Sequence, residues 1–216
     1  MVKLGFSLLV VLLCYLLLLI KAEYSTSSIT KQSSNSLDFI KASCKATTYP
    51  ALCVHSLSPF ATRIRQSQRQ LSQTALAVSL SKAKSAGDFV SKMTRVKGIT
   101  PRERAAVKDC IENMADTIDR LSQSVRELGH MGRAVGQDFA WHVSNVQTWV
   151  SAALTDENTC LDGFGGRGMN GHVKASIRRS VVSVAQVTSN ALALVNRFAS
   201  EHHRSPTKAA DLVHDP

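Results

Sequence analysis

The spacing of apolar residues in four long segments is the feature that most constrains how this chain can fold. In each segment apolar side chains recur at intervals of three and four, which places them along one face of an α-helix. Four such helices joined by short loops bury these faces together in an up-down-up-down bundle. The positions are Leu71, Ala75, Val78, Ala86, Phe89 and Met93; Val107, Cys110, Met114, Ile118, Leu121, Val125 and Leu128; Phe139, Val143, Val146, Val150 and Ala153; and Val173, Ile177, Val184, Ala191, Leu194 and Phe198.

Composition and local signals support an all-α fold. Hydrophobic residues make up 44% of the chain but aromatic residues only 6%, a balance that suits packed helices better than a β-sandwich. The second segment begins with Thr100, Pro101 and Glu103, the pattern of a helix that starts with a capping box. We therefore predict a four-helix bundle over residues 69–200, with a polar, flexible tail over residues 201–216.

The N-terminus indicates export. A positive start precedes an unbroken apolar run from Leu4 to Ile20, and a Ser/Thr-rich segment follows. The run is almost long enough for a membrane anchor, but it lacks a basic cytoplasmic flank. We therefore predict a signal peptide over residues 1–22, cleaved after Ala22, and a polar leader over residues 23–35. After cleavage the chain is expected to be secreted and free of the membrane.

Cleavage leaves four cysteines, Cys44, Cys53, Cys110 and Cys160. An even number in an oxidising compartment implies two disulfides, and three pairings are possible. The stretch SCKATTYPALC has the wrong spacing for a zinc knuckle or a thiol redox motif. We choose Cys44–Cys53 because it is local, which leaves Cys110–Cys160. The first bridge would staple a short α-hairpin over residues 36–65.

No motif for catalysis occurs in the sequence. The patterns H-E-x-x-H, G-x-S-x-G and C-x-x-C are missing, and the histidines are scattered. Gly163, Gly165 and Gly168 match G-x-G-x-x-G, but the dinucleotide motif follows a strand and this one follows a helix. We therefore predict an interhelix connection there, no catalytic, cofactor or metal site, and a protein that is not an enzyme. Trp141 and Trp149 are interpreted as residues at the edge of the core.

Four stretches that occur in order resemble one known family. They are SCKATTYPALC, AVKDCIENMADTIDRL, VQTWVSAALTDENTC and NALALV. Together they are similar to the plant invertase and pectin methylesterase inhibitor family over about residues 36–199. The resemblance implies a noncatalytic inhibitor of the cell wall or apoplast, which binds an enzyme one to one and covers its active-site cleft. The family's disulfide pattern, first with second and third with fourth, agrees with the pairing chosen above.

The resemblance leaves two target enzymes, a pectin methylesterase and an acid invertase. Invertase inhibitors of the family tend to carry Pro-Lys-Phe between the last two helices, and the loop DGFGGRGMNGHVK lacks it. The expected target is therefore a pectin methylesterase, with an acid invertase as the alternative. A net charge of +10 also suits a wall protein that binds acidic pectin without any enzyme target. Nucleic acid is not an expected partner of a secreted chain.

The predicted contact surface lies on the second and third helices. Glu112, Asp116 and Asp119 form an acidic ladder, spaced four and three apart, opposite the apolar face of the second helix. The alternative is a solvated helix face that is neutralised by Arg120 or Arg126.

On the third helix, Thr148 and Ser151 project away from the apolar face. Family complexes use exposed polar and acidic positions on these two helices, so the resemblance implies that both groups contact the enzyme.

Overall fold

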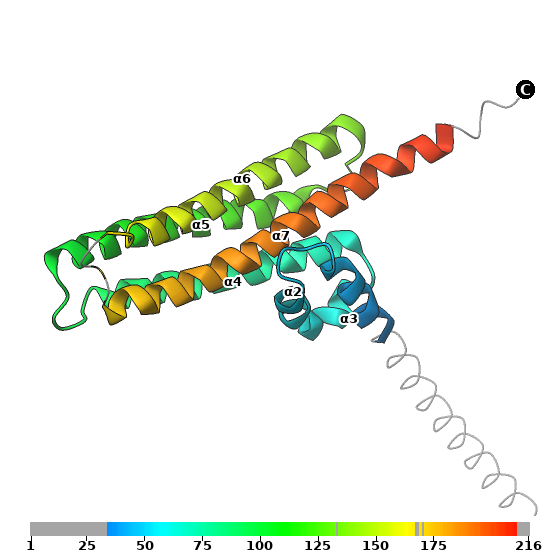
Figure 1. The fold of residues 1–216 in the computed structure, drawn as a ribbon. Helices are drawn as coiled ribbons and strands as arrows, with labels where there is room; N and C mark the ends of the chain where they lie inside the picture. The colour runs from blue at the N-terminus through cyan, green and yellow to red at the C-terminus, as the bar shows by residue number, and fades with distance from the viewer. Residues whose placement is uncertain (1–33, 133, 167–168, 170, 211–216) are drawn as a thin grey trace, which may run out of the picture.

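Four long antiparallel helices make up most of the chain. The computed structural model describes residues 34–132, 134–166, 169 and 171–210. The predicted signal peptide, leader residues 23–33, Gly168 and residues 211–216 lie outside that part. Each of the long helices reverses the direction of the one before it, as Figure 1 shows. They are α4 (Gln68–Met93), α5 (Pro101–His130), α6 (Gly136–Asp162) and α7 (His172–Ala210).

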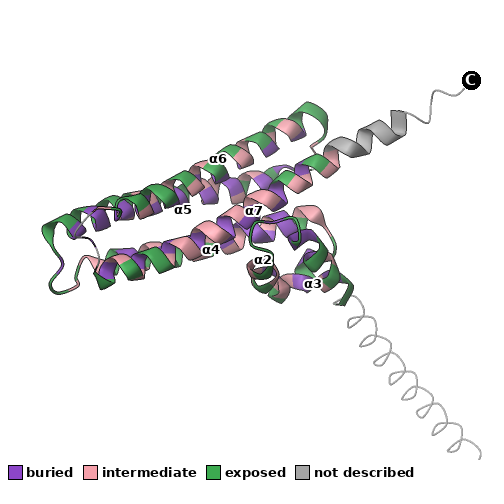
Figure 2. Cartoon of the chain, in the orientation of Figure 1, coloured by how far each residue is buried: buried purple, intermediate pink, exposed green. Residues whose placement is uncertain are grey.

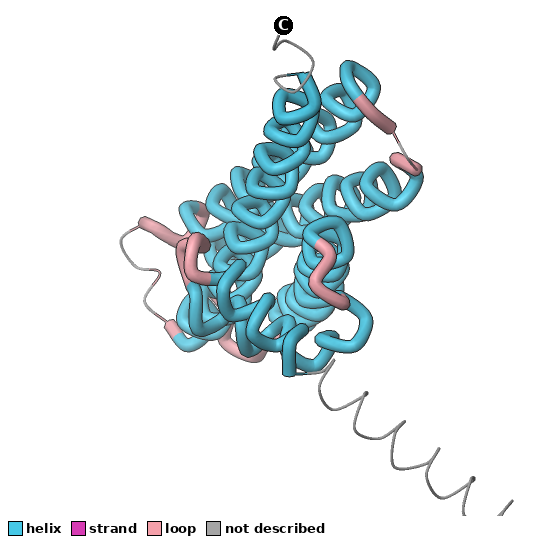
Figure 3. Tube along the Cα trace, turned by 90° about the vertical axis from the view of Figure 1, so that its right-hand side faces the viewer, coloured by secondary structure: helices cyan, strands magenta, loops and turns pink. Residues whose placement is uncertain are grey.

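The all-α prediction is confirmed. Every described residue lies in a helix, a turn or a loop, as the rotated view in Figure 3 shows. Helix α4 packs against both α5 and α7, and α6 packs against both as well. This is the neighbour pattern of an up-down-up-down bundle. None of the described helices is both long and apolar enough to cross a membrane.

The start of α5 has the predicted capping box. The Thr100 hydroxyl accepts a hydrogen bond from the Glu103 N–H at 3.2 Å, and a Glu103 carboxylate oxygen accepts one from the Thr100 N–H at 3.0 Å. The hydrogen bonds from the Thr100 backbone and side chain hold the pKa of Glu103 below its ordinary value. Pro101 occupies the first helical turn, where its missing N–H costs nothing.

The core follows the predicted periodicity most closely in α6, where all five predicted positions are buried. In α4 the prediction is only partly right, because Val78, Phe89 and Met93 lie at the edge of the core. Helix α4 contacts α5, α7 and the N-terminal hairpin, so its buried arc is wider than one stripe. Figure 2 shows this alternation of buried and exposed faces along the bundle. The additional buried positions of α4 are Ser72, Thr74, Leu76, Ser79, Ala83 and Val90.

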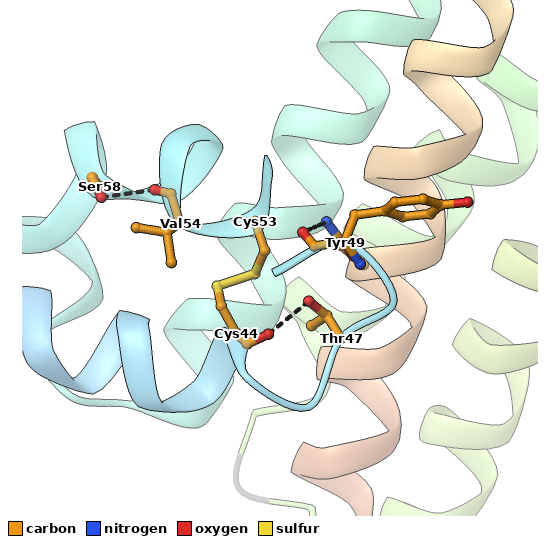
Figure 4. Close-up of a disulfide and its surroundings, with 7 residues drawn as sticks. Cys44, Thr47, Tyr49, Cys53, Val54 and Ser58 are labelled. Atoms are coloured by element: carbon orange, nitrogen blue, oxygen red, sulfur yellow. Dashed lines mark hydrogen bonds between the residues drawn. A yellow bond between two sulfur atoms is a disulfide. The ribbon is translucent and has the colours of Figure 1, made fainter. Parts of the chain in front are cut away.

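An N-terminal hairpin packs against the side of the bundle. Residues 34–44 are helical, and α2 (Pro50–Leu57), the short 3-10 helix η1 (Ser58–Phe60) and α3 (Ala61–Ile64) follow. A Cys44–Cys53 disulfide closes the hairpin (Figure 4). A second disulfide joins Cys110 on α5 to Cys160 on α6. These are the pairs that the sequence analysis chose.

One side chain of α7 fixes the hairpin to the bundle. Asn190 accepts a hydrogen bond from the Tyr49 N–H and donates one to the Tyr49 C=O, both at 3.0 Å. Asn190 is buried, whereas Tyr49 is exposed. The amide therefore satisfies both backbone groups of the residue that precedes α2.

Replacing Asn190 with alanine is expected to lower the free energy of unfolding by about 1–3 kcal/mol, because the partly buried Tyr49 N–H loses its partner. The Tyr49 C=O keeps the hydrogen bond from the Cys53 N–H at 2.9 Å. Urea unfolding measures this loss. The matched control is Ser189→Ala, which removes a hydrogen bond from the Ser189 hydroxyl to the exposed Thr48 hydroxyl at 3.2 Å. It is expected to lower the free energy of unfolding by less. An equal loss in the two variants would contradict the anchoring role of Asn190.

The last helix is longer than predicted. Helix α7 runs to Ala210, ten residues past the predicted end of the bundle at residue 200. The flexibility of residues 201–216 stays a prediction. Glu201 pairs with Arg197 at 2.8 Å and accepts a hydrogen bond from Gln68 on α4 at 3.1 Å. The His202 ring stacks on Phe139 of α6 with their centroids 3.8 Å apart. Polar residues of α7 beyond its apolar stripe therefore contact α4 and α6.

Candidate partner-binding surface

The acidic ladder lies on the outer face of α5. The side chains of Glu112, Asp116 and Asp119 are all exposed. Asp109 is exposed as well, and it lies three residues before Glu112 on the same face. The sequence analysis missed Asp109, although the same spacing of three would have included it.

No described ion pair neutralises the ladder. Arg120 turns instead to α6, where its Nε lies 2.6 Å from a carboxylate oxygen of Asp156. Arg126 is exposed and forms no ion pair within the described part of the chain. Asp119 accepts a hydrogen bond from Gln123 at 2.8 Å. The alternative of a ladder neutralised by Arg120 or Arg126 is therefore wrong.

A row of hydroxyl groups lies on the outer face of α6. Thr148 and Ser151 are exposed, as predicted, and Ser144 and Thr155 extend the row at helical spacing. The Thr155 hydroxyl donates to the Ser151 C=O at 3.2 Å. Since α5 packs directly against α6, the structure brings the charged row and the neutral hydrogen-bonding row together on adjacent helices.

Side-chain contacts fix α5 and α6 to each other. Glu127 of α5 contacts His142 Nδ1 at 2.8 Å and accepts a hydrogen bond from Asn145 at 3.1 Å. Burial raises the pKa of Glu127, but the hydrogen bonds from His142 and Asn145 bring it below its ordinary value. Together with the pair of Arg120 and Asp156, these contacts hold the two outer faces in one arrangement.

Two of the three exposed large apolar side chains of the described residues lie near one end of this surface. Trp141 is 61% exposed and Val135 is 70% exposed, both close to the start of α6. The interpretation of Trp141 as a core-edge residue is therefore wrong, whereas Trp149 is half-buried. Exposed tryptophan is a common anchor in protein interfaces.

The structure also contains a buried carboxyl group that the sequence analysis missed. Glu157 of α6 is fully buried, and one of its oxygens accepts a hydrogen bond from the Thr188 hydroxyl of α7 at 2.9 Å. The Thr188 hydroxyl lies 2.6 Å from the Ser79 hydroxyl of α4. Burial raises the pKa of Glu157 to about 8. Its spacing of four from Ala153 and three from Cys160 places it on the buried stripe, a signal that could have identified it.

The described residues include no cluster of three His, Cys, Asp or Glu that could hold a metal ion. The surface combines a row of exposed carboxylates that form no described ion pair, a row of hydroxyls and an exposed indole on adjacent helices, groups that suit recognition of a protein partner.

Comparisons with known proteins place this architecture. Residues 38–194 match the family described as plant invertase/pectin methylesterase inhibitor. Pectinesterase inhibitor 9 of Arabidopsis thaliana is 58% identical over 179 residues, which cover 82% of this chain and 88% of that protein. The 21 kDa protein of Daucus carota is 52% identical over 164 residues, which cover 76% and 85% of the two chains.

A solved structure shares the fold. The crystal structure of a mutant form A of a pectin methylesterase inhibitor from Arabidopsis matches with a TM-score of 0.56 at 21% identity. The match covers 71% of this chain and 92% of that one. Family match, sequence identity and fold agree, and this chain belongs to the plant invertase/pectin methylesterase inhibitor family.

Proposed function

We propose that this chain is a secreted inhibitor of a pectin methylesterase, which it binds one to one through the outer faces of α5 and α6. In that complex it covers the active-site cleft of the enzyme. The observation that carries the proposal is the acidic ladder, exposed and without a neutralising cation, beside the hydroxyl row of α6. Unpaired carboxylates on a rigid helix suit charge-assisted hydrogen bonds to a partner.

The family supports a pectin methylesterase as the target. It is a family of noncatalytic inhibitors, so the chain itself is not an enzyme. Relatives at 58% and 50% identity are named pectinesterase inhibitors. The loop between α6 and α7 also lacks the Pro-Lys-Phe tripeptide that the sequence analysis associated with invertase inhibition.

The proposed site of action is the cell wall. The family has an extracellular role, and the apolar run from Leu4 to Ile20 suits a cleaved signal peptide. Two disulfides in a chain of this size also suit an oxidising compartment. The proposed mature protein is the inhibitor domain over residues 36–200 with its flanking segments.

The double variant Glu112→Ala/Asp116→Ala is expected to raise the inhibition constant toward a plant pectin methylesterase about tenfold or more, equivalent to about 1.4 kcal/mol. Both side chains are exposed, so the melting temperature is expected to stay nearly unchanged. Titrating the purified enzyme with each protein measures the inhibition constant, and a parallel titration of an acid invertase tests the alternative target.

The matched control is Asp38→Ala/Asp88→Ala. It removes two exposed carboxylates that lie outside α5 and α6 and changes the net charge by the same amount. Equal inhibition by the parent and by the ladder variant would exclude the ladder as a contact. An equal loss in the ladder variant and the control would show that net charge, and not the ladder, is responsible.

A further inference from the structure

The end of the bundle that carries the α4–α5 and α6–α7 loops concentrates positive charge. Residues 92–108 contain six lysines and arginines and one carboxylate, Glu103, which the capping box already uses. Residues 172–179, the first turns of α7, contain three further lysines and arginines and no carboxylate. At about 1.5 Å of rise per residue, all these cations lie within roughly 10–15 Å of the end of the bundle.

The cations form a continuous surface because α4 lies between α5 and α7. Lys82 of α4 donates a hydrogen bond to the Ser183 hydroxyl of α7 at 2.7 Å, which links α4 to α7. Arg104 of α5 donates a hydrogen bond to the Thr94 C=O at 3.1 Å, which links α5 to the end of α4. We call this surface the basic end and represent it by six residues, all at least partly exposed: Lys92, Arg95, Arg104, Lys108, Lys174 and Arg179.

These six cations lack a carboxylate partner among the described residues. Across the described ranges, none of the six forms an ion pair. The exposed carboxylates within four residues of them in the sequence are Asp88, Asp109 and Glu112. An open groove of about 510 Å³ between the α4–α5 loop and α5 is lined by Arg104 and Lys108. An array of unpaired cations beside a groove suits an extended polyanion.

We propose that the basic end binds a polyuronate, the de-esterified form of pectin. Hydrolysis of a methyl ester on pectin leaves a carboxylate, so the product of the enzyme that the named relatives inhibit is a polymer with regularly spaced negative charges. The proposal goes beyond enzyme inhibition, because the basic end gathers the α4–α5 loop and the first turns of α5 and α7, whereas the acidic ladder runs along the middle of α5 and meets the basic end only where Lys108 lies one turn before Glu112. The inhibitor is then retained on wall regions that have already lost their methyl esters.

Two other polyanionic partners fit the surface less well. Single-stranded nucleic acid binding relies on exposed aromatic side chains for stacking, and membrane-surface helices insert apolar side chains. The exposed large apolar residues of the described chain are Tyr49, Val135 and Trp141, none of which belongs to the basic end. The basic end therefore combines cations with a groove that Ile99, Pro101 and Ala105 also line, and no large apolar side chain is exposed there. This combination matches a sugar polymer that carries carboxylates.

Binding of the full mature chain to polygalacturonate, to highly methyl-esterified pectin, to duplex DNA and to anionic vesicles tests the proposal. We expect binding to polygalacturonate that weakens as salt rises and is at least about tenfold tighter than binding to the other three. The triple variant Lys92→Gln/Arg95→Gln/Arg179→Gln is expected to weaken it at least about tenfold and to reduce its salt dependence.

The control is Lys45→Gln/Arg63→Gln/Arg126→Gln, which removes the same charge from exposed sites outside the basic end. It is expected to retain binding within about threefold. Equal losses in the two triple variants, equal binding of all the polyanions, or no binding to polygalacturonate would overturn the proposal.

Complex formation with the esterase in the absence of pectin separates this inference from the proposed function. The basic-end variant is expected to form that complex like the parent protein. Loss of esterase binding by the parent, with polygalacturonate binding retained, would exclude only the inhibitor function. Intact esterase binding without polygalacturonate binding would exclude only the role of the basic end.

Discussion

Replacing Glu157 with glutamine is expected to remove a large part of the pH dependence of this protein's stability between about pH 4.5 and about pH 8. The side chain is fully buried, and burial raises the pKa of Glu157 to about 8 from an ordinary value of 4.5. Glutamine has nearly the same shape and does not titrate, so it retains the packing and removes the ionisation.

The surroundings of Glu157 favour the protonated carboxyl. Thr188 of α7 donates one hydrogen bond to it, and Ser79 of α4 contributes only a hydroxyl, which contacts Thr188. The second carboxyl oxygen has no hydrogen-bond partner. The nearest charge is that of Asp156, which also raises the pKa of Glu157, and the cation of α5 on that side, Arg120, pairs with Asp156. Hydroxyl groups alone do not offset the cost of burying a carboxylate.

The direction of the effect follows from proton binding. The pKa is higher in the folded state, so between pH 4.5 and about 8 the folded protein holds a proton that the unfolded chain has released. This contribution to stability is complete below pH 4.5, falls by about 1.4 kcal/mol per pH unit as pH rises, and is lost above about pH 8. The protein is therefore expected to be less stable at neutral and alkaline pH than at acidic pH.

Urea unfolding of the parent and of Glu157→Gln at several pH values measures the difference between their free energies of unfolding. We expect that difference to grow in favour of the variant as pH rises. Glu112→Gln is the matched control, because it makes the same chemical change at an exposed site on α5. Parallel pH profiles for the parent and Glu157→Gln would show that Glu157 does not titrate as described.

Much of the fold could be predicted because helical periodicity and capping depend on residues that are close together in the sequence. The buried stripe of α6 and the capping box at Thr100 are examples. The length of α7 could not be predicted in the same way. Residues 201–210 carry no apolar stripe, and the contacts that extend the helix come from Gln68 and Phe139, which are distant in the sequence.

The candidate site could also be predicted only in part. The exposure of Glu112, Asp116, Asp119, Thr148 and Ser151 follows from their positions opposite the apolar faces. The partner of Arg120 does not, because it depends on which α6 residue lies beside α5, and the structure selects Asp156. Spacing alone also places Glu157 on a buried face, but only the fold shows that Thr188 contacts it there and that Ser79 contacts Thr188.

The second large effect is expected from removal of the Cys110–Cys160 disulfide. The bridge joins residues 50 apart, whereas the Cys44–Cys53 bridge joins residues 9 apart. In the chain-entropy account, a longer closed loop restricts the unfolded chain more. The expected stabilisation is about 4 kcal/mol for the Cys110–Cys160 loop and about 2.7 kcal/mol for the Cys44–Cys53 loop. The variant Cys110→Ala/Cys160→Ala is therefore expected to lose more stability than Cys44→Ala/Cys53→Ala.

Urea unfolding of the two double alanine variants measures both losses, and a larger loss from opening the short loop would contradict the expectation. The consequences for function are expected to differ from those for stability. The long bridge joins α5 to α6, but Arg120, Glu127 and His142 also connect these helices, so their outer faces keep their arrangement as long as the chain is folded. Well below its melting temperature, the long-loop variant is expected to inhibit a pectin methylesterase as strongly as the parent, because the bridge restricts the unfolded chain and contributes nothing to the contact surface.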